Sequence, residues 1–518
     1  MAEAAVNFTL GQGGLGRPLQ GFDHYSAMVG YYYESAAITA YATIGDKTYG
    51  SITDAEADGI VDTCAEATAG SVIETVTNKG ATGDIVQVDF TSYDGTVINL
   101  CTYTTVAGDS SVTLLATSLV AAINANTYIH GFTAVVGLSG AYTVTATKAL
   151  GVWVNSKSIT YTITGTVAIT AGTFAGGTKS WLAIFHYQIS EFFRGNPLGI
   201  LYFSIKLDLS SQNITAFNTQ LKSDVASVAA AFNGQARRIG ILANGRTFAT
   251  SMLDAMKVAQ VALFAAYTPA TISITANNTA TALSAQPNLR ALLDEACSFI
   301  AGQSGSGVGY ELSKTQMQTI SSLGLALGCS SKAAVSQSIA EVGAFNVSDG
   351  TECETPVFLD GTAYSAVSQS LRNQLNDFGY IYLRKFPTYT GTYFNADSCA
   401  VSPASDYADI RDNLTIFKAV RGVYTSIMPL LNARNFLNSD GTLSETSIAA
   451  YSSLAGYPLT QMFKDADLSL DPAEVSGAIT VSRTENVAAT KIIPITIKLV
   501  PRGIGREINI TIGYGLTS

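Results

Sequence analysis

The sequence predicts an α+β multidomain protein, with an α/β core, a C-terminal α+β domain and an inserted β-rich domain. Two observations carry this prediction. Strand-like and helix-like segments alternate from residue 199 onward, which is typical of an α/β sheet. An interval without arginine, between Arg17 and Arg194, is rich in Thr, Ala, Val and Gly, and its composition differs from that of the α/β part. A chain of 518 residues is also long enough for several domains of about 100–200 residues each.

Short β-strands dominate the arginine-free interval. Residues 85–91 and 97–104 alternate apolar and polar side chains, and Asp94-Gly95 between them has the chemistry of a hairpin turn. One helix is predicted at 110–124, where apolar residues fall on one side. Further strands are predicted at 133–136, 142–147, 158–164 and 166–170, and a flexible glycine-rich connector at 172–177. We therefore predict that residues 45–178 form an inserted β-rich surface domain.

The α/β core is predicted from residues 23–44 together with residues 179–360. Its strands are predicted at 199–205, 238–243 and 271–275, and its first helices at 214–232 and 250–267. Two further helices, at 289–300 and 317–327, are expected on either side of a glycine-rich surface loop at 302–309.

Two long helical patterns and a strand make up the predicted C-terminal domain, residues 361–505. The first helix, 405–436, contains Pro429, which predicts a kink or a break, and the second, 446–464, is interrupted by Pro458. A strand is predicted at 493–500. Residues 1–22 and 506–518 are predicted as terminal arms, and the second arm contains a regular strand at 507–513. Such a strand needs neighbours to pair with, either in another subunit or, as the alternative, within the chain.

The composition favours a protein that packs against copies of itself. Only 13% of the residues are charged and 47% are hydrophobic, so uncharged small side chains must cover the surface. With 39 acidic and 29 basic residues the net charge is −10, which argues against nucleic acid as the main partner. The six cysteines form no CxxC pair and are predicted to be buried reduced thiols. The N-terminal residues do not have the pattern of a signal peptide, and no membrane insertion is expected.

No motif in the sequence predicts catalysis. Gly11 to Gly16 formally fit GxGxxG, but Arg17-Pro18 follow instead of a helix, so we interpret the segment as a flexible arm or turn. The histidines His24, His130 and His186 lie in different regions without the spacing of metal ligands. We expect His186 to be a packed structural residue and His24 to pair with Asp23. The acidic residues 54, 56, 58 and 62 are interpreted as a solvated helix face. We therefore predict no enzyme activity, no catalytic residues, no cofactor and no metal.

Four segments in the last third of the sequence follow one another in an order that is informative about the family. They are residues 389–397 (Tyr-Thr-Gly-Thr-Tyr-Phe-Asn-Ala-Asp), the helix 409–431 with Lys418-Ala419-Val420-Arg421, the loop 438–443 (Asn-Ser-Asp-Gly-Thr-Leu) and residues 500–503 (Val-Pro-Arg-Gly). In this order they resemble the conserved domain of contractile tail sheath proteins, found in myophage tails, type VI secretion systems and related contractile injection systems. Residues 189–194 and 197–201 resemble the phage gpL-type branch, so the α/β core would be a sheath core. Residues 45–178 show no such match and resemble the variable decorations of these proteins.

This resemblance implies a structural subunit that polymerises around a tail tube and contracts to drive the tube through a target cell envelope. The implied partners are other copies of the chain in stacked hexameric rings, a tail tube protein, and baseplate and tail terminator proteins. The implied location is the tail sheath of a bacteriophage virion, assembled in the cytoplasm of the bacterial host. In such proteins terminal arms add strands to neighbouring subunits. The linker residues expected here are Val6, Phe8, Leu10, Ile508, Ile510 and Ile512.

Three alternatives remain open at this point. The sheath is that of a non-phage contractile injection or type VI-like system, or the chain is an α/β enzyme with a β accessory domain. A cell-surface lattice or adhesin is the third alternative, which the Thr-rich insert favours and the missing signal-peptide pattern disfavours.

Overall fold

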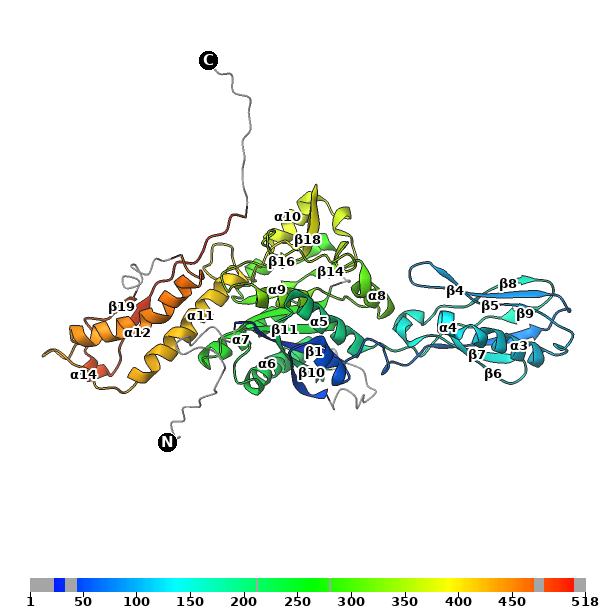
Figure 1. Ribbon diagram of the computed structural model, residues 1–518, viewed down its shortest axis with the longest axis horizontal. Coiled ribbons are helices and arrows are strands. Elements are labelled where there is room, and N and C mark those ends of the chain that lie inside the picture. Colours follow the sequence, from blue (N-terminus) through cyan, green and yellow to red (C-terminus); the bar gives the residue numbers. More distant parts are fainter. Residues whose placement is uncertain (1–22, 33–43, 211–212, 279–280, 470–478, 507–518) are drawn as a thin grey trace, which may run out of the picture.

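The computed structural model describes residues 23–32, 44–210, 213–278, 281–469 and 479–506. Figure 1 shows three parts along the long axis of the molecule. The insert lies at one end, an α/β body occupies the middle, and a pair of long helices forms the other end. The predicted fold class, an α+β multidomain protein with several sheets, is confirmed.

A seven-stranded sheet forms the centre of the α/β body. Its strand order is β16-β13-β12-β11-β1-β10-β2, and all neighbours are parallel except β2, which pairs antiparallel with β10. The central strands are almost entirely buried, as expected for a parallel sheet covered on both faces. The strands are β1 (Tyr25–Tyr32), β2 (Asp46–Tyr49), β10 (Ile200–Leu207), β11 (Arg238–Thr247), β12 (Thr271–Asn277), β13 (Cys297–Ile300) and β16 (Tyr380–Ile381).

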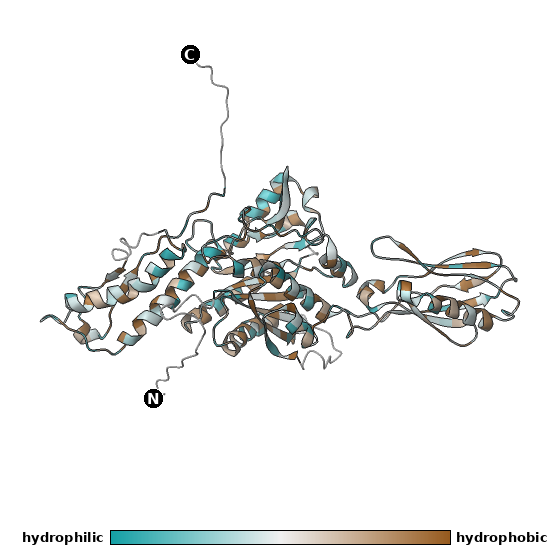
Figure 2. Ribbon diagram, viewed as in Figure 1, coloured by the Kyte–Doolittle hydropathy of each residue, from teal (hydrophilic) through white to brown (hydrophobic). Residues whose placement is uncertain are grey.

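Helices cover both faces of this sheet. One hydrophobic cluster contains residues of α2 (Ile52–Ala57), α5 (Trp181–Gly195), α8 (Gly307–Thr315) and α9 (Leu323–Lys332). The opposite cluster contains residues of α6 (Ile214–Ala231), α7 (Ser251–Ala265) and α10 (Gln369–Asp377). Apolar residues gather in the strands and on the helix sides that face them (Figure 2). Side-chain caps at Ser180 and Asn213 start α5 and α6 by accepting hydrogen bonds from the first helical turn.

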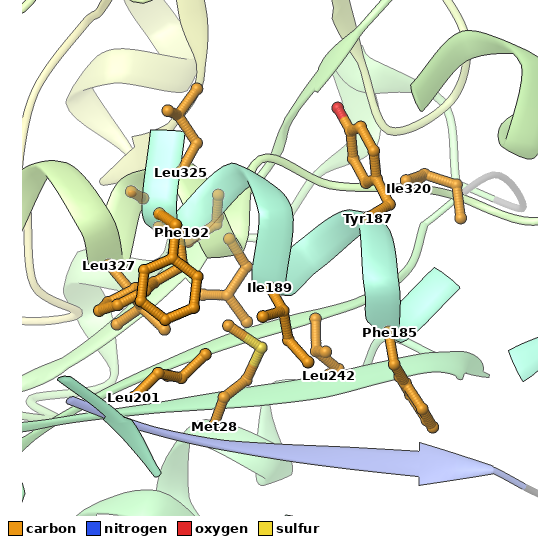
Figure 3. Close-up of a cluster of buried hydrophobic side chains, with 14 of the residues drawn as sticks. Met28, Phe185, Tyr187, Ile189, Phe192, Leu201, Leu242, Ile320, Leu325 and Leu327 are labelled. Atoms are coloured by element: carbon orange, nitrogen blue, oxygen red, sulfur yellow. The ribbon is translucent and has the colours of Figure 1, made fainter. Parts of the chain in front are cut away.

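The α5 helix is the centre of the first cluster. Phe192 and Ile189 of α5 lie over Met28, Leu201 and Leu242, which come from three adjacent strands (Figure 3). On its other side α5 meets α9 backbone to backbone. A Cβ atom at Gly324 would lie 2.0 Å from the carbonyl oxygen of Gln188, and one at Gly328 would lie 2.3 Å from that of Phe192. Only glycine permits this approach, which explains two of the glycines in α9.

Residues 289–309 differ from the prediction. The helix expected at 289–300 is wrong, because Leu289–Ala291 is a single 3-10 turn and β13 (Cys297–Ile300) is a fully buried strand. A short apolar run has no periodicity that separates a buried strand from a buried helix. The surface loop expected at 302–309 is also wrong. Gly302–Ser304 is a buried strand, β14, paired with β15 (Pro356–Phe358), and α8 begins at Gly307. The helix expected at 317–327 begins only at Leu323, as α9.

The insert consists of two antiparallel sheets and one main helix. One sheet has the order β6-β7-β3-β9 and the other has the order β5-β4-β8. Their inward side chains share a hydrophobic cluster with α3 (Val112–Ala125) that is separate from the clusters of the body. The strands are β3 (Ser71–Asn78), β4 (Ile85–Thr91), β5 (Val97–Thr104), β6 (Thr133–Val136), β7 (Ala141–Thr145), β8 (Thr160–Thr164) and β9 (Ala168–Thr170), and a short helix, α4, spans Thr127–His130.

The start of the insert is marked by the pairing of β2. Although β2 and α2 fall within the predicted range 45–178, β2 pairs with β10 of the body and α2 packs beside α5. The insert meets the body again where the Tyr93 hydroxyl donates a 2.8 Å hydrogen bond to Glu311 of α8. The division into domains stays a prediction, and this pairing favours an insert that begins after α2.

A buried carboxyl group makes the stability of the insert depend on pH. Glu74 of β3 is fully buried, and its Oε2 accepts a hydrogen bond from the Gly172 N–H. Burial raises the pKa of Glu74 from 4.5 to about 7. A raised carboxyl pKa means that the folded insert retains the proton while the unfolded chain loses it. The contribution of Glu74 to stability is therefore largest below pH 4.5 and is lost as the pH rises through about 7, a loss of at most about 3 kcal/mol.

Replacing Glu74 with glutamine is expected to remove this pH dependence. The Glu74→Gln variant should unfold at a higher temperature than the unmodified chain at pH 8 and at a similar temperature at pH 4.5. Thermal unfolding followed across this range measures the difference. The same change at the exposed Glu295 is the control and should leave the pH profile unaltered. A profile for Glu74→Gln that matches the unmodified chain at both pH values would contradict the assignment.

Two antiparallel helices dominate the C-terminal part. The first, α11 (Ile410–Ile427), ends before a 3-10 turn at Met428–Leu430, so the break predicted at Pro429 is confirmed. The second, α12 (Glu445–Lys464), runs without interruption through Pro458, and the predicted interruption is wrong. Pro458 is buried, and the helix accommodates its missing N–H without ending. A hairpin β17 (Leu383–Phe386)–β18 (Tyr389–Phe394) precedes these helices, and α14 (Val487–Thr490), β19 (Ile479–Val481) and β20 (Ile495–Ile497) follow them.

Candidate assembly interface

A two-stranded antiparallel sheet lies on the C-terminal helix pair. Ile479 pairs with Ile497, Thr480 with Thr496 and Val481 with Ile495, which joins β19 to β20. The isoleucine and valine side chains face the helices, where they join the clusters that contain Leu459 and Ile448 of α12. Thr480 and Thr496 are exposed on the other face. The apolar face of the sheet thus holds it to the helices, as expected from the alternation of apolar and polar side chains along residues 495–499.

The outer edge of β20 carries backbone groups that point away from β19. The Ser482 N–H donates to the Pro494 carbonyl, so 482 and 494 are a hydrogen-bonded pair, and by alternation Thr480 and Thr496 are the next one. The N–H and C=O groups of Ile495 and Ile497 therefore point outward. Further along, the Ser469 N–H donates to the Val500 carbonyl from the β19 side. Among the described residues no strand pairs with the outer edge of β19 or of β20.

Residue 23, where the described chain begins, is fixed to the middle of α11. One carboxylate oxygen of Asp23 lies 3.0 Å from Lys418 Nζ, and the other lies 3.2 Å from Arg421 Nη2. Lys418 also lies 2.7 Å from Asp467, which is itself buried. Burial acts to lower the pKa of Lys418, but the two carboxylates outweigh burial and raise it. Burial, with neighbouring Arg237, lowers the pKa of Arg421 to about 9.

The other end of the described chain is fixed to the start of the same helix. Arg506 Nη2 lies 2.5 Å from Asp409, the residue that precedes α11. Two residues after Asp409, Arg411 donates a 2.7 Å hydrogen bond to the Arg502 carbonyl oxygen. The residues that border both predicted arms, Asp23 and Arg506, are therefore fixed to α11 and its start. The same helix packs against α12 below the β19–β20 sheet.

The predicted linker residues lie outside the described part of the chain. These are Val6, Phe8, Leu10, Ile508, Ile510 and Ile512, and their role as linkers stays a prediction. Sequence reasoning predicted the strand that contains β20 but missed its free edge. It also missed the Asp23–Lys418–Asp467 contacts, for which no local signal exists because the partners are distant in sequence.

The expected pairing of His24 with Asp23 is not what the structure shows. Asp23 contacts α11, and the ring of His24 lies edge-on to Tyr25 at 4.7 Å.

The edge of the main sheet where open α/β sheets bind ligands is filled by a buried ion pair. In the sheet β1 lies between β10 and β11. The connection from β1 to β10 contains α5 and the connection from β10 to β11 contains α6, and these two helices lie on opposite faces of the sheet. Ligands of such a sheet would bind at the carboxyl ends of these strands. There Arg246 contacts both carboxylate oxygens of Asp208, at 2.5 Å and 2.8 Å. Phe217 covers the guanidinium at 5.1 Å. In the described residues this position holds a structural ion pair.

The other residues singled out in the sequence occupy structural positions. His186 Nε2 lies 2.9 Å from Glu56 Oε1 between α5 and α2, and His130 contacts the Leu100 carbonyl in the insert. Asp54, Glu56, Asp58 and Asp62 are exposed, in agreement with a solvated surface. All six cysteines are buried and unpaired, as predicted. Within the described ranges no group of His, Cys, Asp and Glu residues has the arrangement of a metal site, and no helix is long and apolar enough to cross a membrane.

Two family models divide the chain between them. A model described as DUF2586, N-terminal domain, matches residues 4–398, and one described as DUF2586, C-terminal domain, matches residues 406–518. The chain belongs to the DUF2586 family. The division in the DUF2586 models falls between β18 and α11, so the C-terminal DUF2586 domain contains the helix pair, the β19–β20 sheet and the C-terminal arm. The predicted division, after residue 360, lies before α10.

The remaining comparisons concern curated proteins and solved structures. No curated protein matches the chain. Among solved structures, the sheath tail protein Lin1278 from Listeria innocua has 12% sequence identity and a TM-score of 0.33, with 92% of this chain and 91% of that chain covered.

Proposed function

We propose that this DUF2586 protein is a structural subunit of a contractile tail sheath, which polymerises around a tail tube and contracts to drive the tube through a target cell envelope. The observation that carries the proposal is that Asp23 and Arg506, which border the two predicted arms, are fixed to α11, and that the β19–β20 sheet on the same helix pair has outer edges that no described strand pairs with. The ordered segments at 389–397, 409–431, 438–443 and 500–503, which resemble sheath proteins, support it from the sequence.

Subunits would join by adding arm strands to the β19–β20 sheet of a neighbour. An arm strand that pairs with the outer edge of β20 finds the N–H and C=O groups of Ile495 and Ile497 already aligned. Each backbone hydrogen bond contributes a net free energy of about 0.5–1.5 kcal/mol, so one strand contributes several kcal/mol. The alternating Ile508, Ile510 and Ile512 would set the register, with their side chains continuing the apolar face.

Contraction would then be a rigid-body reorientation of subunits that keeps these strand contacts. The glycines at 11, 13, 14 and 16 let the N-terminal arm turn without steric cost while its strand stays paired. Energy stored in the extended lattice would drive the change. The proposed partners are other copies in stacked hexameric rings, a tail tube protein, and baseplate and tail terminator proteins, within a phage virion assembled in the host cytoplasm.

Removing the C-terminal arm is expected to abolish polymerisation. A chain that ends at Arg506 lacks the strand at 507–513 but retains both anchors on α11, so it should remain a soluble monomer. Negative-stain microscopy and sedimentation velocity measure the outcome, with striated tubes expected from the full chain alone. A chain that lacks only residues 515–518 is the control and should still form tubes. Long tubes from the chain that ends at Arg506 would contradict the linker assignment, and monodisperse globules from the full chain would contradict the sheath.

A further inference from the structure

The outward face of α7 is apolar, although a helix on the surface of a soluble protein normally places polar side chains there. In residues 258–267 the one amide, Gln260, is buried, and no residue is charged. A helix that is apolar on all sides is typical of a covered position. The exposed side chains of this stretch are Val258, Val261, Ala262, Phe264, Ala265, Ala266 and Tyr267.

This apolar face continues onto α11, which lies beside α7 (Figure 1). The Phe264 ring lies 6.1 Å from the ring of Phe417 in α11, and Tyr267 stacks on Tyr424 at 4.5 Å. Further exposed side chains follow four and seven residues after Tyr424, which is the spacing of neighbours along one side of a helix. We define the α7–α11 strip as the large exposed side chains Val258, Val261, Phe264, Tyr267, Tyr424, Met428 and Leu431.

The strip is larger than the apolar patches of ordinary monomers. Its side chains are between 38% and 70% exposed. Counting roughly 150–250 Å² for each such side chain when it is fully exposed, the strip presents on the order of 700 Å². The largest apolar patch of a typical monomer is about 300–600 Å², whereas each partner in a stable protein–protein interface buries about 800 Å². The area therefore corresponds to one side of an interface.

Charge favours another copy of the chain as the partner. The net charge of −10 makes two copies repel each other, so a contact between copies is best placed on surface without charge. Residues 258–270 and 422–433 contain no Lys, Arg, Asp or Glu. The strip thus adds no like-charge repulsion to such a contact.

On α11 the strip borders the side of the helix that lies under the β19–β20 sheet. Val423 and Ile427 pack beneath this sheet together with Ile495. Each of these two residues directly precedes a residue of the strip, Tyr424 or Met428. Successive residues of a helix are about 100° apart around its axis, so the strip lies on the neighbouring side of α11. A copy whose strand pairs with the β19–β20 sheet is therefore brought beside the strip.

We propose that a second copy of this chain covers the α7–α11 strip in the assembled state. The inference rests on the proposed function in one respect, because strand addition is what first ties two copies together. The strip by itself is at the small end of stable interfaces. The contact forms once a paired strand has raised the effective concentration of the neighbour.

Photo-cross-linking of the full chain tests the proposal. The six native cysteines are buried, so a cysteine at an exposed position is labelled selectively with benzophenone maleimide. The test variant is Val261→Cys in the strip, and the control is Val97→Cys, which is similarly exposed on β5 of the insert. Equal amounts of ¹⁵N-labelled and unlabelled chains are mixed at a concentration at which tubes form. Mass spectrometry then counts the cross-linked pairs that contain one peptide of each isotope.

We expect such mixed pairs to be about tenfold or more frequent from position 261 than from position 97. Equal yields from the two positions would overturn the proposal. So would cross-links from position 261 that stay within one chain, for example to residues 1–22, because the strip would then be covered by its own chain.

A charge placed in the strip is expected to weaken assembly without unfolding the subunit. Val261→Lys puts an ammonium group where the neighbour packs, so the concentration needed for tubes should rise about tenfold or more. Val97→Lys makes the same change in net charge outside the strip and should leave that concentration unaltered. Thermal unfolding should be the same for both variants, because both positions are exposed. An unchanged concentration for a normally folded Val261→Lys would contradict the proposal.

The cross-linking result separates the strip from the sheath. Mixed pairs from a chain that never forms tubes would support the strip and contradict the sheath. Tubes from a chain without mixed pairs at position 261 would contradict the strip alone. The absence of both tubes and mixed pairs would contradict both proposals.

Discussion

Replacing Ile497 with proline is expected to abolish tube formation while the subunit stays folded. The N–H of Ile497 points outward from β20, so the β19–β20 ladder does not use it. Proline at this position removes the N–H that an incoming strand needs, and edge positions of this kind are where a sheet tolerates proline. Negative-stain microscopy measures the tubes, and circular dichroism with thermal unfolding measures the fold.

Two variants separate the backbone effect from the side-chain effect. Ile497→Ala retains the N–H but removes the side chain that packs against the helices, so it should form tubes from a somewhat less stable subunit. Thr496→Pro removes an N–H that points toward β19, so it should disrupt the sheet itself. If Ile497→Pro still forms tubes while folding normally, the outer edge of β20 is not the acceptor.

Replacing Asp208 with alanine is expected to destabilise the α/β body by about 3–5 kcal/mol. The change leaves the Arg246 guanidinium buried without the carboxylate that contacts it at 2.5 Å and 2.8 Å. Both side chains are 5% exposed or less, so water replaces the carboxylate poorly. Chemical denaturation followed by tryptophan fluorescence measures the loss, since Trp181 lies in the body.

The double variant Asp208→Leu with Arg246→Met provides the matched comparison. It removes both charges and fills the space with apolar atoms, so it should recover most of the lost stability. A double-mutant cycle then isolates the coupling between the two side chains. If Asp208→Ala leaves the stability unchanged, the ion pair is not a structural element of the sheet. The carboxyl ends of β10 and β11 would then again be a candidate ligand site for the alternative that the chain is an enzyme.

Strands with one solvent-exposed face were the elements that the sequence predicted most accurately. The alternation at 85–91 and 97–104 places Val86 and Val88 in the core of the insert, and the structure has β4 and β5 at these bounds. The alternation records a face toward water, which is a local property. Residues 297–300 lack such a face because both sides of β13 are covered, and there the prediction of a helix was wrong.

The candidate site was predicted only in part. The strand that becomes β20 was expected from its alternation, but nothing in residues 493–500 shows that one edge pairs with β19 and that no described strand pairs with the other. That depends on where β19 and the stretch 468–469 come to lie.

From the sequence alone came the fold class, about half of the described helices and strands, and the order of segments that resembles a sheath protein. Only the folded chain shows which strand edges are unpaired among the described residues, which charges meet, and that Asp23 and Arg506 lie against α11. Arg421 and Asp23, which help to fix the first arm, are 398 positions apart. Helix and strand patterns record whether each side chain faces water, and that is written locally in the chain. Contacts between distant segments are set only when the whole sheet and its helices have packed.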